Sequence, residues 1–262
     1  MSELFSLKGS VAAVCGGAGG IGSRVAVGLA DHGAAVAVVD VAGDRAEQVA
    51  AEIRAGGQNG IAIASDIANP QEADRLMQRI LLTLGGLHIL VNAVGLNVFK
   101  DALELSDADI QQVLVSNLAS ALHVSCAAAR VMRERGGGKI INFASVTARF
   151  GSPGQSIYAA AKAGLVNLTK SLALEWASYN IQVNAVSPVM TETLINAAWL
   201  AADPERKEAI AVTIPAGRLG RPEDLIGPVV FLASRASDFV LGQTLFVDGG
   251  TSVVHPLIRR KR

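Results

Sequence analysis

Short apolar runs rich in β-branched residues alternate with longer stretches of helical period along almost the whole chain. This alternation predicts strands at 11–15, 35–39, 61–64, 87–91, 139–143, 181–186 and 245–247. Helices are expected at 21–31, 45–55, 71–84, 107–134 and 156–178. Strands joined by crossover helices form a parallel sheet that is covered on both faces. We therefore expect an α/β fold with a doubly wound, mostly parallel, seven-stranded sheet.

Size and composition limit the class of protein. With 262 residues, 50% of them hydrophobic, residues 1–262 are expected to form a single globular domain. The 23 basic and 23 acidic residues cancel, which argues against nucleic acid as a partner. Cys15 and Cys126 lack metal-type or disulfide-type spacing, so we predict no metal and a reducing compartment. The start lacks a leader pattern and no run of about 18 uninterrupted apolar residues occurs, which predicts a cytoplasmic protein without a membrane partner.

Two segments do not fit the alternation. Residues 190–215 contain Trp199, acidic residues and a proline but no clear strand, and a connection of this length is typical of a substrate loop or lid. A surface helical hairpin is the alternative. Residues 255–262 end in four basic residues and are expected to form a solvated C-terminal tail, or otherwise to capture an anion across a subunit boundary.

A glycine cluster between 16 and 22 follows the first predicted strand and opens the first helix. Glycines there permit a tight turn and let backbone N–H groups approach a pyrophosphate. Asp40 ends the second predicted strand, where its carboxylate can accept hydrogen bonds from both ribose hydroxyls and repel the 2′-phosphate of NADP. Gly19 and Val41 offer no cation for that phosphate, so the predicted cofactor is NAD. The alternative is an aspartate that only begins a turn.

Tyr158 and Lys162 lie four residues apart, which places them on one face of a predicted helix. A pair with this spacing is usually a surface pair. Here Ser145 follows a predicted strand upstream, and Asn117 lies in a predicted helix. Together with the glycine cluster, these residues point to an active site.

These motifs and their order along the chain resemble those of the short-chain dehydrogenase/reductase family, in its single-domain subfamily of roughly 250 residues. The resemblance covers nearly the whole sequence. It rests on the TGxxxGxG-like loop at 15–22, Asp66, the NNAG-like 92–95, Asn117, Ser145, the YxxxK pair, Pro188, and the segments 218–224 and 242–250.

The resemblance implies a Rossmann-type fold and a homotetramer that uses helices 107–134 and 156–178. The catalytic residues that it implies are Asn117, Ser145, Tyr158 and Lys162. The cofactor-binding residues are Gly16, Gly19, Gly20, Ile21, Gly22, Asp40, Val41, Asp66, Ile67, Asn92, Ala93, Val94, Gly95, Tyr158, Lys162, Pro188, Val189, Thr191 and Thr193.

The side chains suit oxidation of an alcohol. Tyr158 is the candidate base, although a free phenol titrates near about 10 and must be lowered by about 3 units. The Lys162 cation and a positive nicotinamide can supply that shift, while Ser145 orients the substrate oxygen. By the resemblance, Lys162 also binds the nicotinamide ribose and Asn117 helps to hold a water that relays protons through Lys162. We predict an NAD-dependent oxidoreductase that transfers hydride between a secondary alcohol or ketone and the nicotinamide.

Three positions depart from the family pattern. Cys15 replaces a threonine and Ala93 an asparagine; since both polar groups are lost together, the change is expected to be nearly neutral, with Cys15 a packing residue. Val189 replaces the glycine that usually follows Pro188, and its Cβ requires a negative φ near the expected nicotinamide.

Substrate contacts are expected from Asn97, Lys100, Ser145, Arg149, Gln155 and Tyr158. Aromatic residues make up only 4% of the chain, so we favour a sugar, polyol or sugar acid, with Lys100 or Arg149 meeting an acidic group. Either cation is otherwise an ordinary surface charge. The alternatives are a 3-oxoacyl or hydroxysteroid-type reductase, or a non-catalytic NAD-sensing module; the presence of both Tyr158 and Lys162 argues for turnover.

Overall fold

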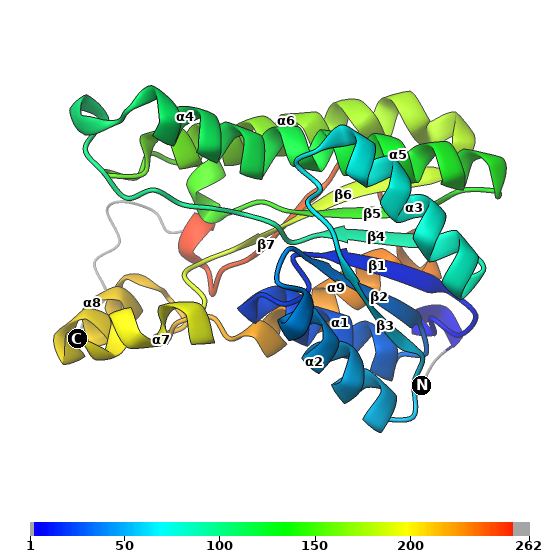
Figure 1. The fold of residues 1–262 in the computed structure, drawn as a ribbon. Helices are drawn as coiled ribbons and strands as arrows, with labels where there is room; N and C mark the ends of the chain where they lie inside the picture. The colour runs from blue at the N-terminus through cyan, green and yellow to red at the C-terminus, as the bar shows by residue number, and fades with distance from the viewer. Residues whose placement is uncertain (1–2, 254–262) are drawn as a thin grey trace.

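A seven-stranded sheet forms the centre of the protein, seen here in a computed structural model that describes residues 3–253 (Figure 1). The strand order is β3-β2-β1-β4-β5-β6-β7, and every neighbouring pair is parallel. The predicted Rossmann-type doubly wound fold is therefore confirmed. The predicted basic tail, 255–262, lies outside the described residues.

All seven predicted strands form, and their ends differ from the predicted ones by at most two residues. They are β1 Val11–Cys15, β2 Ala35–Asp40, β3 Gly60–Ala64, β4 Ile89–Asn92, β5 Gly138–Phe143, β6 Ile181–Pro188 and β7 Thr244–Val247. The helices are α1 Gly20–Asp31, α2 Gly43–Ala55, α3 Pro70–Leu84, α4 Asp107–Leu114, α5 Ser120–Glu134, α6 Ser156–Trp176, α7 Leu194–Ala201, α8 Pro204–Thr213 and α9 Ile226–Ala233.

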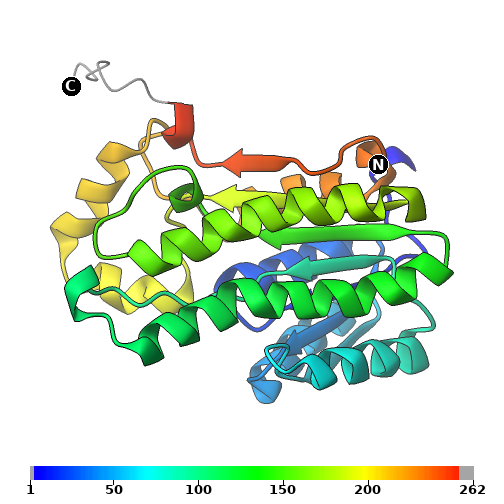
Figure 2. The same ribbon diagram turned by 90° about the horizontal axis from the view of Figure 1, so that it is seen from above.

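Helices cover both faces of the sheet (Figures 1 and 2). Val14 and Val38 belong to the core cluster shared with α1, α2 and α9, whereas Ala13, Ala37 and Leu90 belong to the cluster shared with α3, α5 and α6. Because successive strand residues point to opposite faces and both faces are buried, the central strands are apolar throughout.

The segment predicted as one helix at 107–134 is a helix with an irregular turn. α4 passes into a π-helical turn, Val115–Ala119, and then into α5. By length and a mean hydropathy of 1.3, the segment Asp107–Glu134 is able to cross a membrane, but 50% of its most apolar window is buried inside the molecule. α5 packs against α3 and the sheet, which accounts for its apolar residues.

Residues 190–215 form a helical hairpin of α7 and α8 at the edge of the sheet toward which the strand arrows point (Figure 2). Two backbone hydrogen bonds fix its base, from Gly220 to Met190 and from Glu192 to Gly220, each 2.9 Å long. Asp203 caps the N-terminus of α8 by accepting hydrogen bonds from the backbone N–H groups of Glu205 and Arg206. The hairpin is thus a built element anchored to the segment before α9.

Candidate active site

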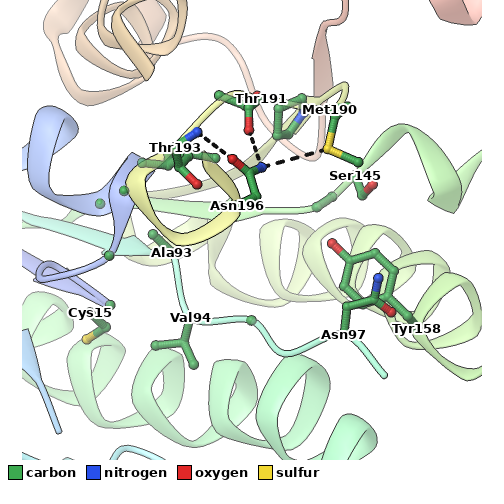
Figure 3. Close-up of a pocket in the computed structure, with 18 of the residues that line it drawn as sticks. Cys15, Ala93, Val94, Asn97, Ser145, Tyr158, Met190, Thr191, Thr193 and Asn196 are labelled. Atoms are coloured by element: carbon green, nitrogen blue, oxygen red, sulfur yellow. Dashed lines mark hydrogen bonds between the residues drawn. The ribbon is translucent and has the colours of Figure 1, made fainter. Parts of the chain in front are cut away.

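A cavity of about 740 Å³ lies at the carboxyl ends of the strands and extends beneath the α7–α8 hairpin (Figure 3). In a parallel sheet this edge is where ligands bind. Most of the predicted cofactor residues line the cavity, namely Gly16, Gly19, Gly20, Ile21, Gly22, Asp40, Val41, Asp66, Ile67, Ala93, Val94, Gly95, Tyr158, Pro188, Val189, Thr191 and Thr193.

The glycine loop has the geometry of an anion cradle. Gly16 has a φ of +76°, and a methyl group on Gly22 would lie 2.0 Å from the Gly16 carbonyl oxygen. α1 begins at Gly20 with no acidic residue in its first turn, and its N-cap, Gly19, offers no side-chain cap. The first backbone N–H groups of α1 therefore face the cavity without an internal acceptor, which fits a pyrophosphate group.

Asp40 is fixed at the end of β2 by two backbone donors. Its carboxylate accepts hydrogen bonds from the N–H groups of Ala18, at 3.1 Å, and Ala42, at 3.0 Å. Arg45, in the first turn of α2, lines the same end of the cavity. This cation was not among the residues predicted from the sequence, because it lies five positions after Asp40 and not next to it. The available signal was a basic residue in the first helical turn after Asp40.

Tyr158 and Ser145 lie together in the wall of the cavity (Figure 3). Ser145 follows β5, is 9% exposed, and caps a short 3-10 turn by accepting the Thr147 N–H at 3.3 Å. Burial raises the pKa of Tyr158, and a hydrogen bond from Ser145 opposes that rise. In the chain by itself the Tyr158 pKa is thus above its ordinary value, in contrast to the lowered value expected beside Lys162 and a positive nicotinamide.

Lys162 lies one turn further along α6, behind the cavity wall. Its side chain is only 3% exposed, and its Nζ donates a 2.8 Å hydrogen bond to the Phe143 carbonyl. The Nζ lies 5.7 Å from the centre of the Tyr158 ring. Burial lowers the pKa of Lys162 to about 8. Lys162 does not line the cavity, and its Nζ lies behind the Tyr158 ring.

Asn117 occupies the π-helical turn and also lies behind the wall. Its Nδ2 donates to the carbonyls of Leu96, at 2.7 Å, and Val113, at 2.9 Å. A methyl group on Gly95 would lie 3.0 Å from Asn117 Oδ1 and 3.3 Å from Lys162 Nζ. Gly95 therefore brings both polar atoms up to the cavity, and π-helical turns are frequent at functional sites.

The three departures from the family pattern fit ordinary packing. Cys15 is fully buried and its pKa is raised by burial to about 12, which confirms a packing role. The Ala93 N–H donates to the Cys15 carbonyl at 2.9 Å. Asn180 is the one non-glycine residue of positive φ in the described chain, so Val189 lines the cavity with an ordinary backbone. Asn92 is buried and, like Lys162, does not line the cavity, so its cofactor role stays a prediction.

Two predicted substrate residues lie elsewhere. Asn97 and Gln155 line the cavity, whereas Lys100 and Arg149 do not. Lys100 is held by Asp109, with Nζ and Oδ2 2.8 Å apart, and the Arg149 guanidinium lies 5.5 Å from the centre of the Phe246 ring. The segment 190–215, predicted as a substrate loop or lid, contributes Met190, Asn196, Ile210, Thr213 and Ile214 to this side. Thr147 is a lining residue that sequence reasoning missed.

The hairpin meets the glycine loop directly. A methyl group on Gly20 would lie 2.4 Å from Thr193 Cβ. Thr193 is the N-cap of α7 and donates its backbone N–H to Asn196 Oδ1 at 2.8 Å, while Asn196 Nδ2 donates to the Thr191 carbonyl (Figure 3). The segment is therefore the helical hairpin given as the alternative, and one side of it lines the cavity. Its role as a substrate lid stays a prediction.

A family model described as enoyl-(acyl carrier protein) reductase matches residues 16–252. The chain belongs to the short-chain dehydrogenase/reductase family. It is 40% identical to 2-dehydro-3-deoxy-D-gluconate 5-dehydrogenase of Escherichia coli (strain K12), over 94% of this chain and 96% of that protein. It is 37% identical to L-rhamnose 1-dehydrogenase (NAD(P)(+)) of Sphingomonas sp. (strain SKA58), over 94% and 98%.

The fold is equally well matched. Gluconate 5-dehydrogenase from Burkholderia cenocepacia J2315, solved in complex with NADP and tartrate, superposes with a TM-score of 0.92 at 36% identity and covers 97% of this chain and 99% of that one. This short-chain dehydrogenase/reductase is accordingly an oxidoreductase that acts on CH–OH groups with a nicotinamide cofactor.

Proposed function

We propose that this enzyme transfers hydride between a secondary alcohol or ketone of a sugar-like substrate and a nicotinamide cofactor, with NAD preferred. One observation carries the proposal. A single cavity joins the glycine loop and Asp40 to Ser145 and Tyr158, with Lys162 directly behind them. Relatives at 35–40% identity named for sugars and sugar acids support the substrate class.

The reaction needs a base for the hydroxyl proton, and the chain provides it beside the substrate space. When bound, the nicotinamide ring accepts or donates the hydride. The Tyr158 oxygen takes the proton from the alcohol, while the Ser145 hydroxyl holds the substrate oxygen and the charge that develops on it. The Lys162 ammonium favours the phenolate of Tyr158, and the Phe143 carbonyl keeps that ammonium in place. Asn117, next to Lys162 at Gly95, holds the proton path toward solvent.

Replacing Tyr158 by Phe tests the assignment. Because the ring remains and only the hydroxyl is lost, the dissociation constant for NAD should stay within about threefold, whereas kcat should fall by at least about 100-fold. Absorbance of the reduced nicotinamide measures turnover, and NAD-induced thermal stabilisation measures binding. Near-normal turnover of the variant would remove Tyr158 as the base. Native protein that is stabilised by NAD but turns over no alcohol would indicate a sensing module instead.

NAD is the proposed cofactor because Asp40 places a negative charge where the 2′-phosphate of NADP would lie. Arg45 lines the same end and offsets part of that repulsion. NADP is therefore accepted, but less efficiently than NAD. We expect kcat/KM with NAD to exceed that with NADP by at least about tenfold. Equal efficiencies would contradict the role given to Asp40.

The proposed substrates are sugars, polyols and sugar acids, which enter beneath the lid formed by 190–215. A panel in which only apolar ketones or 3-oxoacyl thioesters turned over would reject this class. We further propose a single domain, a cytoplasmic location and a homotetramer. The tetramer is supported by apolar side chains exposed on the helices α5 and α6, of which Leu174 is 81% exposed. Light scattering that gives a mass near 27.0 kDa would contradict the tetramer.

A further inference from the structure

The charged side chains in the cavity wall gather at one end. Among the described residues that line it, Asp40, Arg45 and Asp66 carry charge, and all three follow or flank β2 and β3. Ser145 follows β5, which is three strand positions from β2 in the sheet order, or roughly 14 Å. At that separation Arg45 contributes little to a charge beside Tyr158.

The substrate end has neutral hydrogen-bonding groups instead. Apart from Ser145 and Tyr158, its polar side chains include Asn97, Thr147 and Gln155. The Gln155 Oε1 accepts a 2.7 Å hydrogen bond from the Ser152 hydroxyl, so its NH₂ group is what it offers to a ligand. Amides and hydroxyls of this kind both donate to and accept from sugar hydroxyls.

Nearby cations are held by groups of the chain itself. Hydrogen bonds from Lys100 and Ser106 lower the pKa of Asp109 to about 2, which keeps this carboxylate ionised beside Lys100. On the lid, Lys207 Nζ lies 2.7 Å from Glu192 Oε1. Arg206 lies 4.4 Å from the centre of the Trp199 ring and also pairs with Asp203.

Thr147 supplies a positive indication of the ligand. Its Oγ1 is buried, lies in a residue of the cavity wall two positions after Ser145, and has no hydrogen-bond partner among the described residues. A buried hydroxyl without a partner costs stability, so rotation of the Thr147 side chain toward a ligand hydroxyl in the cavity would be favoured. Among the described residues, no cationic side chain lines this end of the cavity, and desolvating a carboxylate is far more costly than desolvating a hydroxyl.

We propose that the substrate is an uncharged polyhydroxy compound, a sugar or polyol, in preference to a sugar acid, and that Thr147 hydrogen-bonds one of its hydroxyl groups. This inference rests on the proposed function and narrows it to one chemical class.

The first test compares matched pairs. Aldoses and hexitols are assayed with NAD beside the aldonates of the same configuration, at one ionic strength. The best neutral compound should exceed its acid by at least about tenfold in kcat/KM. An acid that equals or exceeds its neutral partner overturns the inference and leaves the proposed function intact. Turnover of apolar ketones alone, with no sugar or sugar acid accepted, removes the proposed function as well.

The second test replaces one hydroxyl by a methyl group. Thr147→Val should raise KM for the best neutral substrate by about three- to tenfold and leave the NAD dissociation constant unchanged, and Thr147→Ser should restore KM. Thr244→Val is the matched control, because Thr244 Oγ1 is also buried without a partner but Thr244 does not line the cavity. Unchanged KM in Thr147→Val, or an equal change in Thr244→Val, would overturn the role of Thr147.

Discussion

Gly22→Ala should weaken NAD binding, because the added methyl group would displace the backbone of the glycine loop. The added methyl group would lie 2.0 Å from the Gly16 carbonyl oxygen and 2.8 Å from its carbon, so the loop must move by about an ångström. Overpacking of this kind costs about 1–3 kcal/mol, which lowers Tm by roughly 2–12 °C for a chain of this size. Backbone hydrogen bonds to a charged phosphate contribute about 1.5–3 kcal/mol each, so the NAD dissociation constant should rise at least about tenfold.

The control is a second helical glycine. A methyl group on Gly227, in α9, would meet nothing within 4 Å. Gly227→Ala should therefore raise Tm by a few degrees and leave NAD affinity unchanged, since alanine favours the helix by about 1 kcal/mol. Differential scanning calorimetry and isothermal titration with NAD give both quantities. If Gly22→Ala binds NAD within twofold of the native protein at an unchanged Tm, the tight-loop argument is refuted.

Two further variants test the charges. Because burial lowers the pKa of Lys162 from 10.5 to about 8, the folded chain binds fewer protons than the unfolded chain between these values and gains stability as pH rises through that window. Lys162→Met should thus have a larger free energy of unfolding than the native protein at pH ~7, by up to about 3 kcal/mol, and a correspondingly higher Tm. The difference should close by pH ~10, and turnover should be lost at every pH; a stability difference independent of pH would contradict a buried Lys162 cation. Arg45→Gln should lower kcat/KM with NADP by about tenfold and leave that with NAD within twofold, and equal losses with both cofactors would show that Arg45 does not face the phosphate.

The strands and the ends of the glycine loop were predictable because strongly apolar runs and glycine clusters are local signals. α9 was missed for the opposite reason. Its residues, Ile226–Ala233, are apolar on all sides and include a glycine and a proline, so no helical period distinguishes them from a buried strand.

Which side chains line each end of the cavity was not predictable, because it depends on contacts between residues that are distant in the sequence. Lys100 and Arg149 lie at the right places in the sequence, but Asp109 and Phe246 hold them away from the cavity. No sequence pattern shows in which direction these two side chains point. Thr147 was overlooked because a single threonine after Ser145 carries no signal until its buried, unpartnered oxygen is seen in the structure.

The π-helical turn that holds Asn117 has a consequence for how this site can change. In a regular helix, one inserted residue rotates everything beyond it by about 100°. A π-turn accommodates the extra residue within itself, so α5 keeps Val124, Ala128 and Met132 buried on the sheet. Loss of a single codon at 115–119 would therefore return the segment to a regular helix and change the active-site wall without repacking the core.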